Sequence, residues 1–292
     1  MIMKNKSSGY EIELKNIKNE YDKFLKYYKK KIIVYKGNQL EYYSCGKGKD
    51  TILFMPHISS LIPLEISFKT IMTYEDCFRV IAPVLPDVEN IDELAESINA
   101  ILKDEKIDNV IVFGQSGSTI TAQIFLSRFY KKIKAMILVN TLVPKARKKN
   151  KLSVIFNVLP EFILKYFIKM NFKKYLELEK IPDVYYPKIL FTKYLLEENL
   201  KRYFSKKKFL GDLNMINAFN DENNFIKKTF KNWNGKLLII TSVDDPLYQD
   251  SQLLFHLLPY SQIHVFKEGY GHFTPTVKSN ELIKVIQNFL LK

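Results

Sequence analysis

The sequence is short of the residues and segments that mark secreted and membrane-spanning proteins. It has only two cysteines, Cys45 and Cys77, which lie in unrelated contexts without a metal-ligating neighbour. A reducing, cytoplasmic location is the default for such a chain. Residues 1–31 are charged throughout, and nowhere do about 18 apolar residues follow one another. We therefore expect neither a secretory signal nor a transmembrane segment.

Histidine is scarce as well, and only four positions hold it, at 57, 256, 264 and 272. His256 falls in an expected helix and His264 in an alternating strand pattern, so both are interpreted as structural. His272 differs because it stands in Glu268-Gly-Tyr-Gly-His-Phe-Thr-Pro275, a Gly-flanked segment between an expected strand and the last helix. Glycines on both sides let a loop present the imidazole at the edge of a sheet.

Acidic residues are outnumbered, with 45 Lys and Arg against 31 Asp and Glu, for a net charge of +14. Residues 145–210 hold 17 of the basic and 6 of the acidic residues, so most of the excess lies there. A nucleic-acid or anionic-membrane partner is one interpretation. A general preference for lysine at the surface is the other, and we favour it because no nucleic-acid motif accompanies the charge. We expect no nucleic-acid partner.

The hydrophobic content of the sequence is high enough for a large folded core. The 292 residues are 47% hydrophobic and 14% aromatic, which suits one large α/β domain or a core with an insertion. Short apolar runs predict buried strands, and segments of helical spacing separate most of them. This alternation predicts a mostly parallel, doubly wound sheet. The expected strands are 32–35, 40–45, 51–55, 79–85, 110–113, 134–141, 236–241 and 262–266, and the main helices are 64–72, 91–106, 119–126, 249–258 and 278–291.

The alternation stops between residues 144 and 233, where helical spacing continues and Pro160, Pro182 and Pro187 interrupt it. We divide the chain into an N-terminal helix at 1–30, an α/β core at 31–143 and 234–292, and a helical insertion at 144–233. The insertion is either a cap over a pocket or an ordinary helical subdomain, and composition leaves both open. In the cap interpretation, side chains of residues 154–172 are expected to line the pocket.

The segment Asn109-Val-Ile-Val-Phe-Gly-Gln-Ser-Gly-Ser118 stands out within the core. A buried strand leads into small residues at 114, 117 and 118, and a helix follows. A strand that reverses sharply into a helix exposes the residue at the apex, here Ser116. The free N–H groups at the helix start can stabilise a developing oxyanion. Ser118 departs from the G-x-S-x-G pattern, but it is small enough to keep the turn.

A second segment that could supply a catalytic residue is Ser242-Val-Asp-Asp-Pro-Leu247, which follows an expected buried strand. Asp-Asp-Pro is also good turn chemistry on its own. In chain order the candidates are Ser116, then an aspartate, then His272. That order is the one found in one arrangement of the Ser–His–acid triad.

Together, Gly-Gln-Ser-Gly-Ser at 114–118, Ser-Val-Asp-Asp-Pro-Leu at 242–247 and Gly-Tyr-Gly-His-Phe at 269–273 give the chain a resemblance to a known family. Residues 31–292 resemble α/β-hydrolase-fold proteins with an inserted helical cap. The resemblance implies Ser116 as nucleophile, His272 as base and Asp245 as the acid that orients His272. Asp245 is preferred to Asp244 because the family's loop usually reads Asp-Pro or Asp-x-x-Pro three residues after a small residue, here Ser242.

The loop at Pro56-His57-Ile58 departs from the family, which carries His-Gly after its third strand. The resemblance implies an oxyanion hole made by the backbone N–H groups of Gly117 and Ile58, or of His57 if the loop is shifted. Loss of the glycine restricts φ in this loop. His57 and Gln115 are expected beside the pocket.

We therefore expect a serine hydrolase of the esterase or thioesterase type that forms an acyl-enzyme at Ser116. Its substrate is expected to be a small-molecule ester or thioester with an apolar or acyl part, free or carrier-bound, and neither a cofactor nor a metal is called for. A binding or scaffold protein on the same fold, similar to maspardin, is the alternative. An acyltransferase or cyclase that uses the same triad is a further one. The sequence does not determine the oligomeric state.

Overall fold

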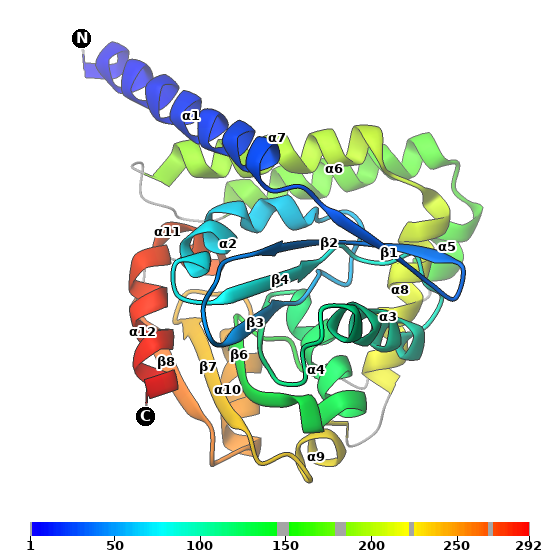
Figure 1. Ribbon diagram of the computed structural model, residues 1–292. Coiled ribbons are helices and arrows are strands. Elements are labelled where there is room, and N and C mark those ends of the chain that lie inside the picture. The colour runs from blue at the N-terminus through cyan, green and yellow to red at the C-terminus, as the bar shows by residue number, and fades with distance from the viewer. Residues whose placement is uncertain (1, 145–151, 179–184, 222–224, 268–270, 292) are drawn as a thin grey trace.

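An eight-stranded sheet forms the centre of the protein (Figure 1). The computed structural model describes residues 2–144, 152–178, 185–221, 225–267 and 271–291. The strand order is β1-β2-β4-β3-β5-β6-β7-β8. Strand β2 pairs antiparallel with both β1 and β4, and all the other pairs are parallel. The strands are β1 (Lys31–Tyr35), β2 (Asn38–Cys45), β3 (Thr51–Phe54), β4 (Arg79–Pro83), β5 (Val110–Gln115), β6 (Ile133–Val139), β7 (Lys236–Ser242) and β8 (Gln262–Phe266).

The helices lie on both faces of this sheet and beyond one end of it (Figure 1). They are α1 (Ile2–Tyr27), α2 (Phe68–Glu75), α3 (Ile91–Asp104), α4 (Ser118–Phe129), α5 (Leu152–Val158), α6 (Glu161–Leu178), α7 (Tyr186–Arg202), α8 (Lys206–Asp221), α9 (Phe225–Phe230), α10 (Tyr248–Leu257), α11 (Thr274–Val277) and α12 (Ser279–Leu291). None of the helices in the described ranges is long and apolar enough to cross a membrane.

Alternation along the central strands divides the core into two clusters. Val110 and Val112 of β5 pack into one cluster, with side chains of α3, α4, α8 and α9. Ile111 and Phe113 of the same strand pack into the other, with side chains of α1, α2, α7 and α12. Because successive side chains of a strand point to opposite faces, a strand covered on both faces is apolar at every position. The predicted mostly parallel, doubly wound α/β sheet is confirmed.

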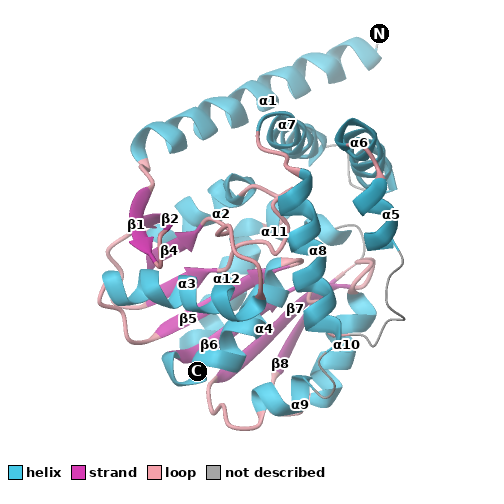
Figure 2. Ribbon diagram, turned by 90° about the vertical axis from the view of Figure 1, so that its right-hand side faces the viewer, coloured by secondary structure: helices cyan, strands magenta, loops and turns pink. Residues whose placement is uncertain are grey.

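The segment between β6 and β7 is helical, as expected, and contributes α5 to α9. Its parts at 145–151, 179–184 and 222–224 lie outside the described residues. Helices α6 and α7 of this insertion lie with α1 at one side of the molecule, outside the sheet (Figure 2). The division of the chain into helix, core and cap stays a prediction.

We expected side chains of residues 154–172 to line a pocket, and this prediction is wrong for the six that are exposed to solvent. Ile155, Val158, Phe162, Tyr166, Phe167 and Met170 are each between 47% and 77% exposed, more than the wall of an enclosed pocket allows. The buried residues Leu164 and Ile168 pack with Leu200 and Phe209 of the insertion itself. Position 154 and residues 172–178 have no described side chains.

Candidate active site

Ser116 sits at a strained turn between β5 and α4. Its φ is +54°, in the left-handed region that L-residues seldom occupy. Its N–H donates to the carbonyl of Val139 at 2.9 Å, and its own carbonyl accepts from the Thr119 hydroxyl at 2.6 Å. These bonds hold the strained residue in place, with its side chain at the carboxyl end of the parallel sheet.

Ser118 closes the turn from the inside. Its Oγ accepts from the N–H of Gln115 at 2.6 Å and donates to the carbonyl of Gln115 at 2.9 Å. A glycine at this position would lack both bonds, so the departure from the expected motif adds hydrogen bonds to the turn. Gly114 must stay small, because a Cβ there would lie 2.9 Å from the Ser118 carbonyl oxygen and 3.1 Å from the Cα of Thr119.

The three residues expected to form a triad lie in one hydrogen-bonded chain. His272 Nε2 is 2.8 Å from Ser116 Oγ, and His272 Nδ1 is 2.8 Å from Asp245 Oδ2. The Asp245 side chain is fully buried, and its other oxygen accepts from the N–H of Leu247 at 2.5 Å. The histidine side chain keeps 12% of its surface exposed. A buried carboxylate thus holds one ring nitrogen while the other faces the serine.

The backbone around His272 is fixed by two further residues. Asn140, which follows β6 with a φ of +50°, donates from Nδ2 to the His272 carbonyl at 3.0 Å. Asp244 Oδ1 accepts from the N–H of Gly271 at 2.9 Å and from the Ser242 hydroxyl. Residues 268–270, part of the motif singled out in the sequence, lie outside the described residues. His272 itself stands in a short 3-10 turn, Gly271–Phe273, rather than in an open loop.

The loop after β3 approaches Ser116 from the other side. The imidazole of His57 packs on Gly117, so closely that a Cβ at Gly117 would lie 2.9 Å from His57 Nδ1. Burial of this ring, and secondly the nearby His272, lower the pKa of His57 to about 4. His57 is therefore neutral at neutral pH. Ile58 is 2% exposed, and neither its N–H nor that of Gly117 donates to another of the described residues.

Two helices of the insertion, α7 and α8, form hydrogen bonds with the loop after β3. Asp212 of α8 accepts from the N–H of Ser60 at 2.6 Å and from the Ser60 hydroxyl at 2.7 Å, both at Oδ2. Asn199 of α7 donates from Nδ2 to the carbonyls of Ser60 and Leu61, at 2.9 and 3.0 Å. Asp212 is 4% exposed, and burial raises its pKa to about 6 against the opposing effect of its bonds to Ser60.

On the opposite side of the site, α7 touches the neighbour of His272. Ile189 of α7, Phe273 and Val277 form a small buried cluster. The insertion therefore contacts both the loop that carries Ile58 and the segment that carries His272.

The structure brings together Ser116, Asp245, His272, His57 and Gly117. Ile58 follows His57 in the same loop, and Gln115 ends the strand that leads to Ser116. Sequence reasoning did not identify Asn140, Asn199 or Asp212. An asparagine directly after a buried strand is a weak signal of a left-handed residue. Nothing in the local sequence distinguishes Asn199 and Asp212 from other polar residues of a helix. His256 and His264 lie in α10 and β8, as expected, outside this group.

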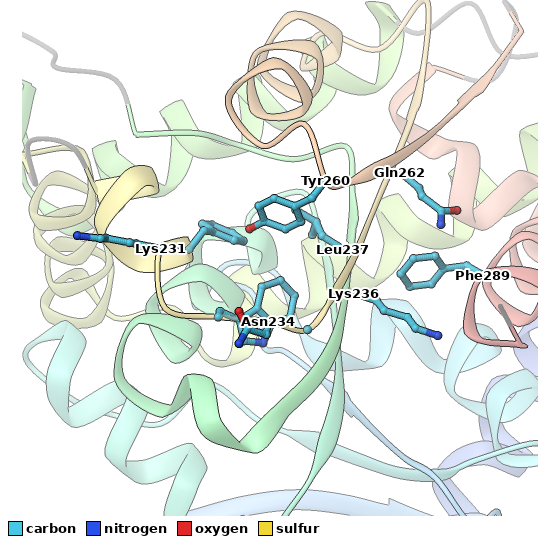
Figure 3. A pocket seen from close by; sticks show the side chains of 10 residues that line it. Lys231, Asn234, Lys236, Leu237, Tyr260, Gln262 and Phe289 are labelled. Carbon is cyan, nitrogen blue, oxygen red and sulfur yellow. The ribbon is translucent and has the colours of Figure 1, made fainter.

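A separate cavity of about 570 Å³ opens at the other end of the sheet (Figure 3). Lys236 and Gln262 on its wall are the first residues of β7 and β8. Ligands of parallel α/β sheets bind beyond the carboxyl ends of the strands, where Ser116 lies. This cavity lies at the amino ends of β7 and β8, and none of the residues of the site around Ser116 lines it.

Solved structures share the fold of this chain, although no family model matches the sequence and none of the curated proteins does. A bacterial membrane phospholipase A is 13% identical, with a TM-score of 0.68 over 96% of this chain and 91% of its own. Est816, an N-acyl homoserine lactone degrading enzyme, is 14% identical, with a TM-score of 0.67 over 89% of this chain and all of its own. MGS-M2, an α/β hydrolase enzyme from a deep-sea metagenome library, is 14% identical, with a TM-score of 0.67 over 90% and 98% of the two chains. With its sheet, its turn at Ser116 and these likenesses, the chain has the α/β-hydrolase fold.

Proposed function

We propose that the protein is a serine hydrolase that cleaves an ester or thioester through an acyl-enzyme at Ser116. The observation that carries the proposal is the chain of two 2.8 Å hydrogen bonds from Ser116 through His272 to Asp245. A serine hydroxyl is a weak nucleophile until an adjacent base accepts its proton. The buried carboxylate of Asp245 favours the tautomer in which Nδ1 carries a proton and Nε2 is free to act as that base.

In the proposed reaction, Ser116 Oγ attacks the substrate carbonyl while its proton passes to His272 Nε2. The C–O or C–S bond to the leaving group then breaks, and His272 returns the proton to that group. Water, deprotonated by His272, attacks the acyl-enzyme and releases the carboxylic acid with Ser116 restored. Asp245 stabilises the imidazolium formed in each half of the cycle.

The tetrahedral intermediates carry a negative oxygen that needs hydrogen-bond donors. The N–H groups of Gly117 and Ile58 suit this role: Gly117 follows the serine, Ile58 follows the His57 ring that packs on Gly117, and neither N–H is used by another described residue. Gly117 precedes the first turn of α4, whose N-terminus favours negative charge. His57 supports this part of the site as a neutral group, since a second positive charge beside His272 is disfavoured.

A non-catalytic binding protein is the alternative function. It has no physical need for a strained serine, a buried carboxylate and a histidine hydrogen-bonded between them, so the hydrolase accounts for more of the geometry. An acyltransferase would use the same first half-reaction and differ only in the acceptor of the acyl group.

Labelling by a fluorophosphonate probe tests the proposal. The wild-type protein should be modified at one serine, and peptide mass mapping should place the adduct on Ser116. Ser116→Ala should keep the melting temperature within a few degrees and lose both the label and at least about a thousandfold in turnover of an activated ester. A wild-type protein that resists the probe, or that turns over an ester no faster than Ser116→Ala, would contradict the hydrolase.

A further inference from the structure

Helix α6 is apolar on two opposite sides, although only one side faces the protein. Leu164 and Ile168 are buried against Leu200 and Phe209. Phe162, Tyr166 and Met170 point away, with 73%, 63% and 52% of their surface exposed. Residues four apart lie on one face of a helix, so these three form a single outward row. The solvent face of an ordinary surface helix is polar instead.

Two apolar residues of the preceding helix, α5, are exposed as well. Ile155 and Val158 of α5 are 49% and 77% exposed. Lys206 of α8 ties the junction of the two helices, because its Nζ donates to the carbonyls of Asn157 and Leu159 at 2.6 and 2.7 Å. We call Phe162, Tyr166, Phe167 and Met170 of α6 the outer apolar face. Exposed apolar side chains of this size on one helix form a patch of the kind that binds a partner.

The charges beside this face indicate the chemistry of the partner. Lys165 and Lys169 lie one residue before Tyr166 and Met170 on the same helix, and the stretch of sequence that contains α6, residues 145–210, has 17 basic and 6 acidic residues. Glu161, the acidic residue at the start of α6, is paired with Lys165 at 3.3 Å. Aromatic and aliphatic side chains flanked by lysines are typical of helices that lie in the interface of an anionic membrane.

We propose that the outer apolar face docks on an anionic phospholipid bilayer, with α6 lying along its surface. Phe162, Tyr166 and Met170 enter the boundary between headgroups and acyl chains, and the lysines meet lipid phosphates. Docking gives the protein access to esters held in a membrane, a consequence that rests on the proposed function. The binding itself does not depend on the reaction.

Vesicle flotation with the full chain tests the docking. Wild-type protein should float with vesicles of phosphatidylcholine mixed with phosphatidylglycerol, and far less with phosphatidylcholine alone. Phe162→Ser/Tyr166→Ser/Met170→Ser should weaken binding to the anionic vesicles by at least about tenfold, since each side chain removes apolar surface from water. Lys165→Gln/Lys169→Gln should weaken it as well, and added salt should reduce the difference between this variant and wild type.

A matched control removes three exposed apolar side chains elsewhere. Ile32 and Val34 on β1 and Tyr260 are 57%, 71% and 51% exposed. Ile32→Thr/Val34→Thr/Tyr260→Ser should float like the wild type, and so should Ser116→Ala. Circular dichroism and turnover of a water-soluble ester, measured on both triple variants, separate lost docking from lost folding.

The outcomes decide the proposal without reference to the reaction. Vesicle binding that survives the Phe162, Tyr166 and Met170 substitutions overturns it, as does a wild-type protein that ignores anionic vesicles. A dimer that these substitutions convert to a monomer, with no vesicle binding in either protein, assigns the face to a second copy of the chain instead. A protein that binds vesicles through this face but hydrolyses no ester leaves the docking intact and removes the hydrolase.

Discussion

Two adjacent aspartates contact the region of His272 in different ways. Asp245 accepts a hydrogen bond from the imidazole, whereas Asp244 accepts from the N–H of Gly271 and the hydroxyl of Ser242. The first contact fixes the tautomer of the base, and the second fixes only the backbone that carries it. A neutral amide in place of Asp245 presents its NH₂ group or a weaker acceptor to Nδ1, and no longer stabilises the imidazolium.

We predict that Asp245→Asn lowers kcat by about 10³ to 10⁴, and that Asp244→Asn lowers it by less than about a hundredfold. Steady-state kinetics on one activated ester, with melting temperatures for both proteins, provide the comparison. A larger loss in Asp244→Asn at equal stability would reassign the acid of the triad.

His57 makes the stability of the protein depend on pH. Its pKa is lowered to about 4 in the folded state, by burial and then by His272, from an ordinary value of 6.5. The unfolded chain therefore binds a proton more readily in the interval between these values. The contribution of the neutral ring to the free energy of unfolding is complete above pH 6.5 and is lost as the pH falls toward 4.

We predict that the difference in melting temperature between wild type and His57→Asn moves against the wild type as the pH is lowered from about 7 to about 5. Scanning fluorimetry of both proteins across this range measures it. Asp212, whose raised pKa has the opposite effect, is present in both proteins and cancels from the difference. A difference that stays constant with pH would mean that His57 titrates normally.

At the scale of elements, the sequence made most of the core predictable. Runs such as Val110–Phe113 are buried on both faces, so each residue carries the same apolar signal, and β5 appears where it is expected. The turn at Ser116 was predictable because its small residues, at 114 and 116–118, lie within five positions of one another. The hydrogen bonds from α7 and α8 to the loop after β3 were not predictable. Ser60 and Asp212 are 152 positions apart, and their bond leaves no local pattern in the sequence. The segment around His272 forms the 3-10 turn Gly271–Phe273 and then α11, where a loop was expected. The Thr274 hydroxyl donates to the Gly271 carbonyl there.

We predict that the hydrogen bonds from α7 and α8 to Ser60 and Leu61 support catalysis because they fix the backbone of the loop that contains Ile58. Asp212→Ala/Asn199→Ala removes the partners of Ser60 and Leu61 and should lower kcat by roughly tenfold or more, with a smaller change in KM. Single-turnover acylation of Ser116 measures the effect directly. Lys201→Ala, an exposed change near the end of α7, serves as the control. Unchanged acylation in a folded double variant would show that the loop keeps its position without α7 and α8.

At the scale of the whole molecule, the insertion and the core share their apolar interior. Phe219 of α8 and Phe225 of α9 pack into the cluster that holds β5 and α4, and Phe191 of α7 packs into the cluster on the opposite face. Trp233 stands where the insertion returns to the sheet. It is 4% exposed, and its Nε1 donates to the carbonyl of Ile133 in β6 at 2.6 Å. An insertion that buries large side chains in both core clusters loses their contacts when the core opens.

We therefore predict that the insertion and the core unfold together. The chain contains one tryptophan, so fluorescence excited at the red edge, where tyrosine does not absorb, reports on Trp233 alone, whereas far-UV circular dichroism reports on all helices. Urea transitions followed by the two signals should coincide in midpoint and slope, as in a single cooperative unit. Phe219→Ala opens a cavity under α8 and should lower the free energy of unfolding by about 3–5 kcal/mol. Both midpoints should therefore move together to a lower urea concentration. A circular dichroism transition that precedes the fluorescence change, or that Phe219→Ala shifts alone, would establish the insertion as an independently folding unit.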